Sequence, residues 1–391
     1  MKDALLLILG AVLGVTMDRA WDASGGRIKR LRSKRRAAKR QNQEDSLRSA
    51  IVEAYSASGL GDELYVTKTF HAPVQLPILH DPTLAVMGTL DGAADHFVSV
   101  AESRRVELPA DMRVIDAMKR AGAELWDGNV LYAKDVSAPP AGPFHIRAGV
   151  CNYYAYVTEK ETIRRDLTQR KQLKVPSDLR NLRTALATRR GPLTLAGSAI
   201  CVFESARGPE VAIQRRSSSV VSATGLLGVI PLFGLESNLD GTTRSRFGTL
   251  AYNFLKEFME EFYGIEELTR AASSSKLHPD WIFDIPKANG VVGEMNSRRL
   301  RLTVLDVGFD LRDASLTFAL LAQFDSPAFL DRLKLDLSPG SESEGRSAAE
   351  KPVRFVPLHG AELAAAAMSG EMDSSSIFAL DLARVHYGMK G

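Results

Sequence analysis

Three glutamates, Glu257, Glu260 and Glu261, have the spacing needed to form one chemical site. At i, i+3 and i+4 their carboxylates lie on neighbouring positions of a helix. Carboxylates this close repel one another, and a divalent cation such as Mg²⁺ or Mn²⁺ relieves the repulsion because it prefers oxygen ligands. The simpler alternative is an acidic face that only contacts water, as most charged helix faces do. The elements around these residues decide between the two interpretations.

The helix that carries these acids is predicted over residues 249–265. Phe254, Phe258 and Phe262 recur at i, i+4 and i+8, which is the period of an apolar stripe packed on a core. The sequence therefore predicts an amphipathic helix with aromatic rings on one side and carboxylates on another.

Short, β-prone segments precede this helix. Three strands and a connecting loop are predicted at residues 193–204, 210–216, 228–235 and 236–247. The first two strands are separated by a turn with glycine and proline, so they are predicted to form a hairpin. Pro231 and Gly234 interrupt the third strand. A hairpin, a strand and a loop thus lead directly into the acidic helix.

This order resembles the Nudix hydrolase family. That family has a QRR(S) segment at the end of a hairpin, a Pro/Gly strand end, and a helix with the pattern R-E-U-x-E-E-x-G-U, where U is bulky and aliphatic. The matching residues here are Gln214, Arg215, Arg216, Ser217, Pro231, Gly234 and residues 256–261. The resemblance implies an α/β fold, with a Nudix-like α/β/α sandwich and mixed sheet over residues 191–391. Paired strands at 300–310 and 314–324, a strand at 353–357 and helices at 360–369 and 374–387 are predicted to complete it.

The same resemblance implies a function. Glu257, Glu260 and Glu261 would bind Mg²⁺ or Mn²⁺, Glu260 and Glu261 would be catalytic, and the substrate would be a nucleoside diphosphate-linked compound. Metal ions assist such reactions by neutralising charge on phosphate oxygens. Arg215 and Arg216 are the candidate phosphate contacts.

The chain departs from the family pattern by eight residues inserted between Gly234 and Lys256, by one extra residue between Glu261 and Gly264, and at two single positions. Lys256 stands where the family has an arginine, and lysine cannot make the bidentate contacts that an arginine makes. Gly248 occupies the place of an earlier glutamate, for which Glu236 is the nearest replacement. Three functions stay open: a metal-dependent diphosphate hydrolase, a catalytically silent nucleotide-sensing domain, and a membrane-associated interaction protein without enzymatic activity.

The amino terminus predicts a membrane anchor. Residues 4–17 form an apolar run, and nine basic residues follow between Arg27 and Arg40. A basic block after an apolar run holds that side in the cytoplasm and attracts anionic lipids. We expect a single transmembrane helix within residues 1–22, a basic juxtamembrane segment at 23–42 and a cytoplasmic main body. A cleaved signal peptide and a buried or interfacial helix are the alternatives.

The remaining chain carries less information about function. Residues 43–190 are predicted to be an α+β accessory region, with a helix at 112–125, a strand at 150–157 and a charged helical segment at 159–186. The chain has 391 residues and a net charge of only +3, which excludes a global polyanion-binding surface. No aromatic residues interleave the basic block, so specific nucleic-acid binding is not expected. The sequence leaves the oligomeric state open.

Overall fold

The computed structural model describes most of the chain after residue 45. The described ranges are 46–84, 86–90, 96–120, 123, 125–138, 144–168, 175–188, 191–216, 225–240, 243–265, 281–337 and 353–388. The predicted anchor (1–22) and basic segment (23–42, with Arg27 to Arg40) lie outside these residues.

Strands and helices alternate along the described chain. The strands are β1 Leu64–Val66, β2 Gln75–Leu79, β3 Gly88–Leu90, β4 Val98–Val106, β5 Asn129–Ser137, β6 His145–Asn152, β7 Thr194–Phe203, β8 Glu210–Arg215, β9 Leu227–Val229, β10 Leu232–Gly234, β11 Leu239–Asp240, β12 Thr243–Arg244, β13 Leu300–Asp310, β14 Ser315–Phe324 and β15 Arg354–Pro357. Residues 46–57 form a first helix. The other α-helices are α2 Met112–Arg120, α3 Tyr153–Thr168, α4 Leu182–Thr188, α5 Thr249–Tyr263, α7 Pro286–Asn296, α8 Pro327–Asp336, α9 Ala361–Met368 and α10 Ser374–His386.

Thirteen of the described strands form one mixed sheet, with the main order β1-β2-β13-β14-β7-β5-β6-β4. Its centre is the parallel pair β7 and β14, which stay in register from Thr194 and Ser315 to Phe203 and Phe324. Strands β2 and β3 pair with β13, and β5 meets β7. Residues 43–190 and residues 191–391 therefore contribute strands to the same sheet.

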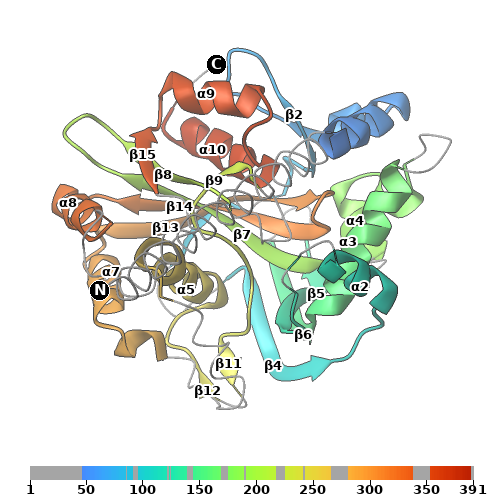
Figure 1. Cartoon of the computed structure of the whole chain (residues 1–391), viewed down its shortest axis with the longest axis horizontal. Helices are drawn as coiled ribbons and strands as arrows, with labels where there is room; N and C mark the ends of the chain where they lie inside the picture. The colour runs from blue at the N-terminus through green and yellow to red at the C-terminus, as the bar shows by residue number, and fades with distance from the viewer. Residues whose placement is uncertain are drawn as a thin grey trace, which may run out of the picture.

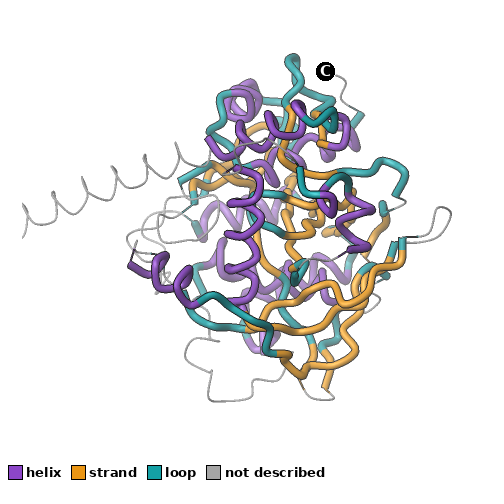
Figure 2. Tube along the Cα trace, turned by 90° about the vertical axis from the view of Figure 1, so that its right-hand side faces the viewer, coloured by secondary structure: helices purple, strands orange, loops and turns teal. Residues whose placement is uncertain are grey.

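Helices cover both faces of this sheet. In Figure 1, α5 and α7 lie below the central strands, while α9 and α10 lie above them. The perpendicular view shows the strands running between helices on either side (Figure 2). Alternation along β7 explains the two layers, because successive side chains of a strand point to opposite faces. Cys201 and Phe203 join the core under α5, whereas Ile200 and Val202 join the core under α10.

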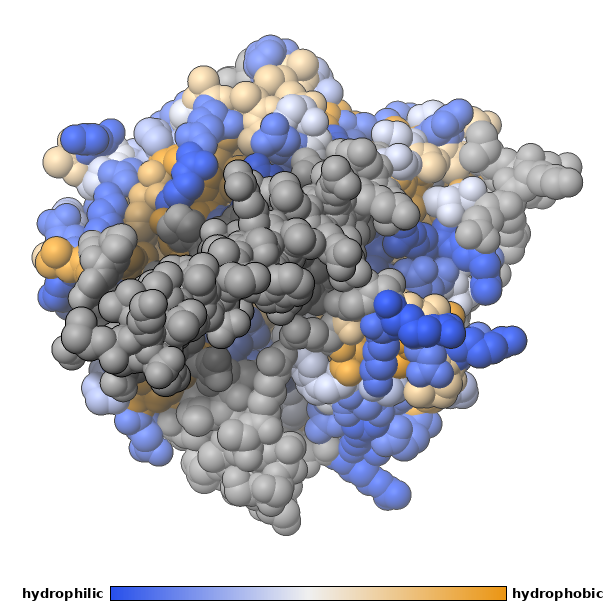
Figure 3. Space-filling model, viewed as in Figure 1, coloured by the Kyte–Doolittle hydropathy of each residue, from blue (hydrophilic) through white to orange (hydrophobic). Residues whose placement is uncertain are grey.

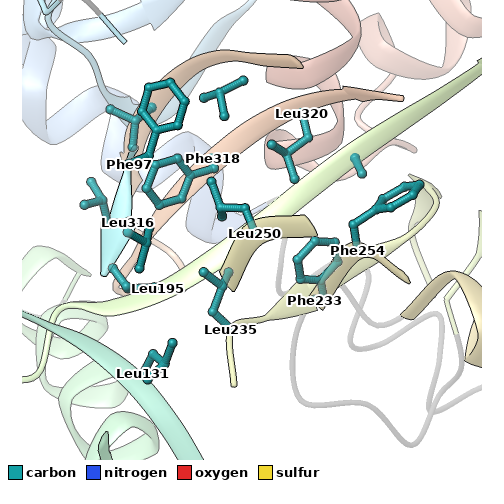
Figure 4. Close-up of a cluster of buried hydrophobic side chains, with 14 of the residues drawn as sticks. Phe97, Leu131, Leu195, Phe233, Leu235, Leu250, Phe254, Leu316, Phe318 and Leu320 are labelled. Carbon is teal, nitrogen blue, oxygen red and sulfur yellow. The ribbon is translucent and has the colours of Figure 1, made fainter. Parts of the chain in front are cut away.

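The stripe of aromatic residues predicted on α5 is confirmed. Phe254, Phe258 and Phe262 are fully buried, and Phe258 stacks on Phe262 with ring centroids 4.2 Å apart. Figure 4 shows Leu250 and Phe254 among the apolar side chains of β7, β10 and β14. Aromatic packing of this kind buries a large apolar area and fixes the rotation of the helix about its axis. The helix ends at Gly264, which has a positive φ of 63° and whose N–H donates to the carbonyl of Glu260.

Most elements predicted between residues 193 and 387 are present. The hairpin β7–β8, the helix α5, the pair β13–β14, the strand β15 and the two closing helices α9 and α10 are all confirmed. The predicted strand 228–235 is divided into β9 and β10 at Pro231, which has no N–H to donate to a sheet.

The strand predicted at residues 150–157 is wrong in its second half. Strand β6 ends at Asn152, and α3 begins at Tyr153. The N–H of Tyr153 donates to the carbonyl of Gly128, and the N–H of Tyr154 donates to the Asp127 carboxylate at 3.0 Å. A distant loop therefore caps the start of this helix, and the cap overrides the β preference of the aromatic residues.

The predicted fold class needs a correction. The structure is α/β with a large mixed sheet, but none of the helices in the described part of the chain is long and apolar enough to cross a membrane. The fold class that included a single transmembrane helix, and the localisation as a single-pass membrane protein with a cytoplasmic body, are therefore wrong on this point and are not retained.

Buried charges connect the two parts of the chain. The Arg312 guanidinium donates to Asp310 at 3.0 Å and to Asp373 at 2.7 Å, and all three side chains are almost completely buried. Next to it, Lys160 of α3 pairs with Asp313 at 2.6 Å. Asp373 also caps α10 by accepting from the N–H of Ser376. This network ties the β13–β14 turn to α3 and α10.

Candidate functional site

The three glutamates of α5 are half-buried. The exposed fractions of the Glu257, Glu260 and Glu261 side chains are 17%, 20% and 19%. A freely solvated acidic face would leave such side chains mostly accessible to water. The structure therefore does not fit the simpler alternative, because these carboxylates are held against protein.

Lys256 lies among these acids. Its ammonium is 3.4 Å from Glu236, 3.5 Å from Glu257 and 3.3 Å from Glu260, and its side chain is only 2% exposed. A buried ammonium is tolerated when charged partners replace the water that it has lost. The lysine at the family's arginine position is thus the shared counter-ion of three carboxylates.

The structure brings Glu236 to the helix, although Gly248 stands at the family's glutamate position. The buried amide of Asn253 accepts from the N–H of Glu236 at 2.8 Å and donates to its carbonyl at 2.9 Å. The same amide also donates to the carbonyl of Thr249 at 2.8 Å. Asn253 therefore fixes the loop before α5 so that the Glu236 side chain reaches Lys256.

We expect Asn253→Ala to destabilise the protein by about 2 kcal/mol, because it leaves buried backbone groups of the Glu236 loop without their partners. Urea unfolding measures this loss. Asn289→Ala on the exposed side of α7 is the matched control and should change stability little. Equal stability of Asn253→Ala and the wild type would contradict the role of this amide.

The two arginines predicted to contact phosphate lie on opposite faces of the sheet. Arg216 approaches Glu261 at 3.8 Å, on the side of α5. Arg215 donates to the carbonyl of Gly225 at 2.8 Å and lies 3.3 Å from Glu371, where it lines an open cleft of about 310 Å³ beside α9. The structure brings only Arg216 to the carboxylates of α5.

The predicted metal site requires side chains that can act as ligands close together in the structure. Within the described ranges, no group of three or more His, Cys, Asp or Glu side chains is arranged to hold a metal ion. Mg²⁺, however, is usually bound by one or two carboxylates together with water and substrate phosphates. Glu257 and Glu261 stand four residues apart on α5, the spacing that places two side chains on one side of a helix. The cofactor prediction stays a prediction.

Sequence reasoning missed the roles of Lys256 and Asn253. The Lys256–Glu260 pair has the i, i+4 spacing of helical ion pairs, so the sequence contained a signal for it. The contact between Asn253 and Glu236 joins a loop to a helix, and no local sequence pattern predicts it.

The sequence matches no protein-family model and no curated protein. The Nudix resemblance therefore stays a prediction that depends on the residues quoted for it and on the arrangement around α5.

Proposed function

We propose that the protein is a metal-dependent hydrolase of a nucleoside diphosphate-linked substrate, acting at the carboxylates of α5. One observation carries the proposal: the acids are half-buried, and they face two different basic side chains. Lys256 contacts Glu257, Glu260 and the loop residue Glu236, whereas Glu261 faces Arg216. A solvated helix face would need neither of these arrangements.

Glu257 and Glu261 are the residues that would hold Mg²⁺ or Mn²⁺. When bound, the cation would supply positive charge to the oxygens of a diphosphate. Glu261 also lies next to Arg216. The guanidinium of Arg216 is suited to phosphate oxygens because its N–H groups form a planar fork. Glu260 keeps Lys256 in place, so its contribution to catalysis is to position the loop that carries Glu236.

The test is turnover by the full chain with Mg²⁺ and a panel of nucleoside diphosphate-linked compounds. We expect Glu257→Gln and Glu261→Gln to lower kcat at least about 100-fold, because each removes a charged ligand. Glu260→Gln should lower the melting temperature as well, since it removes a partner of Lys256. Glu362→Gln, an exposed change on α9, is the control. Absence of turnover with every compound, or full activity of Glu261→Gln, would contradict the proposal.

A second candidate is favoured by the position of Lys256. An ammonium within 3.5 Å of Glu236, Glu257 and Glu260 already neutralises part of the acidic cluster. The domain would then bind a nucleotide without cleaving it. This function predicts that a nucleotide raises the melting temperature while no product forms, and it fails when no nucleotide stabilises the protein.

A further inference from the structure

An open cleft lies beside α9, on the face of the sheet opposite α5. Its volume of about 310 Å³ is at the lower end of the range of sites that bind small molecules. In Figure 3, apolar and hydrophilic surface meet in the region of α9, at the top of the view. The lining residues that determine its chemistry are Arg215, Leu227, Ala365, Ala366 and Glu371, and we call this site the α9 cleft.

The charged side chains of the α9 cleft form two ion pairs that differ in closeness. Arg354 and Glu362 are in direct contact with each other. The Arg215 guanidinium lies 3.3 Å from the Glu371 carboxylate, longer than the about 2.7–2.9 Å of a close charge-assisted hydrogen bond. The Arg215 and Glu371 side chains are 32% and 52% exposed. Exposed ion pairs contribute little to stability, so a ligand can separate this second pair at little cost.

Backbone contacts hold the two charges of the second pair next to each other. One nitrogen of Arg215, Nη1, donates to the carbonyl of Gly225 at 2.8 Å, and Nη2 is the atom that faces Glu371. Glu371 lies between α9 and α10, where its carbonyl accepts from the N–H of Leu227 at 2.8 Å. A positive and a negative group are therefore already in place for a ligand, which lowers the cost of binding.

The charges of the α9 cleft favour a zwitterion over an anion. The lining contains two arginines and two glutamates, so an isolated phosphate or carboxylate ion would also meet carboxylates that repel it. A ligand that carries both a carboxylate and an ammonium offers one partner to Arg215 and one to Glu371. An α-amino acid has these two groups on the same carbon atom, which suits two side chains that lie 3.3 Å apart.

The remaining lining of the cleft is apolar. Leu227 and Ala366 are almost completely buried, and Ala365 lies next to Ala366 on α9. Alanine side chains leave space that longer side chains would fill. An aliphatic group placed against them is removed from water, which favours binding.

We infer that the α9 cleft binds a free α-amino acid with an aliphatic side chain. The ligand carboxylate accepts from Arg215, the ligand ammonium donates to Glu371, and the aliphatic chain packs against Leu227 and Ala366. The site on α5 lies on the other face of the sheet, so the inference does not depend on the proposed hydrolysis.

Isothermal titration calorimetry with the full chain tests the class of ligand. We expect leucine, valine or isoleucine to bind with a Kd of about 1 mM or lower, which a titration to about 10 mM detects. Two relatives of leucine are the matched controls: 4-methylpentanoate lacks the ammonium, and 3-methylbutylamine lacks the carboxylate. Each should bind at least about 10-fold more weakly, because one of the two charged contacts is lost. Absence of binding by all three amino acids, or tighter binding of inorganic phosphate, would overturn the inference.

Substitutions then assign the binding to the α9 cleft. Arg215→Gln and Glu371→Gln should each weaken leucine binding at least about 10-fold and leave circular dichroism unaltered, because both side chains lie at the surface. Glu371→Gln should also strengthen binding of 4-methylpentanoate, since the carboxylate that competes for Arg215 is gone. Arg113→Gln removes the arginine of an exposed ion pair at α2 and should bind leucine like the wild type. Equal leucine affinity of the wild type, Arg215→Gln and Glu371→Gln would contradict the α9 cleft as the site.

Discussion

Replacing Lys256 with methionine should destabilise the protein by about 3 kcal/mol, because removal of one partner leaves the other charges of a buried pair uncompensated. Methionine keeps the length of the side chain, so packing changes little. The charges left behind belong to Glu236, Glu257 and Glu260, which now repel one another. Thermal unfolding should show a melting temperature lower by roughly 4 °C.

The same variant tests how the acidic cluster responds to cations. Mg²⁺ should stabilise Lys256→Met more than it stabilises the wild type, because a divalent cation replaces the lost ammonium. Lys256→Arg is the control, since it keeps the positive charge next to Glu236 and Glu260. If Lys256→Met melts like the wild type with and without Mg²⁺, the lysine is not the counter-ion of these carboxylates.

The second large effect is expected in the pH dependence of stability, at Asp310. Burial raises the pKa of this carboxyl to about 6 from its usual 3.8, and the charge of Arg312 only partly opposes the shift. Asp313 and Asp373 face the same cluster and add to the rise. The folded protein therefore binds a proton at Asp310 at a pH where the unfolded chain does not.

The sign follows from linkage. Stability falls with rising pH wherever the folded state binds more protons, so Asp310 favours unfolding at neutral pH and this effect disappears as the pH drops below 6. Between pH 7 and pH 5 the wild type should gain about 1 kcal/mol relative to Asp310→Asn, which cannot titrate. Urea unfolding at several pH values measures the difference. Asp284→Asn, an exposed change, should keep the wild-type dependence of the free energy of unfolding on pH. If the difference in unfolding free energy between the wild type and Asp310→Asn does not change with pH, Asp310 is not the group that titrates.

Asp373 limits this gain at low pH. Its burial would raise its pKa, but Arg312 and Ser375 outweigh the burial and hold the pKa below its usual value. A carboxylate with a lowered pKa stabilises the folded state above its unfolded pKa and loses that contribution as the pH falls further. Stability should therefore pass through a maximum below pH 6 and then decrease.

The sequence predicted the carboxyl-terminal half of the fold well because local patterns determine it. The i, i+4 spacing of Phe254, Phe258 and Phe262 placed α5, and apolar runs placed β7, β13 and β14. The strand predicted through Tyr153 failed for the opposite reason. Asp127, 27 residues before Tyr154, caps α3 there, and tertiary contacts of this kind decide short aromatic segments.

The candidate site, too, was predictable from the sequence only where a local pattern defines it. The i, i+3 and i+4 spacing selected Glu257, Glu260 and Glu261 as candidates, and the structure places all three half-buried on α5. Arg215 is the last residue of β8 and Arg216 follows it directly, so the alternation of side chains along extended chain places the two arginines on opposite faces. The path of the Glu236 loop depends on the amide of Asn253, which is a three-dimensional contact. The sequence therefore identified the candidate acids, whereas their counter-ion and the path of their loop came from the structure.

The pairing of β2 with β13 also has a consequence for synthesis on the ribosome. Leu79 lies opposite Phe309, so β2 emerges about 230 residues before its partner. At roughly 5–20 residues per second, the strand waits on the order of 10–50 s with an unpaired edge. Pro77 in the middle of β2 has no N–H to offer, which makes the waiting strand a poorer template for pairing with another nascent chain. Pro77 donates no hydrogen bond to the complete sheet, and for the same reason it disfavours pairing of the incomplete sheet with another chain.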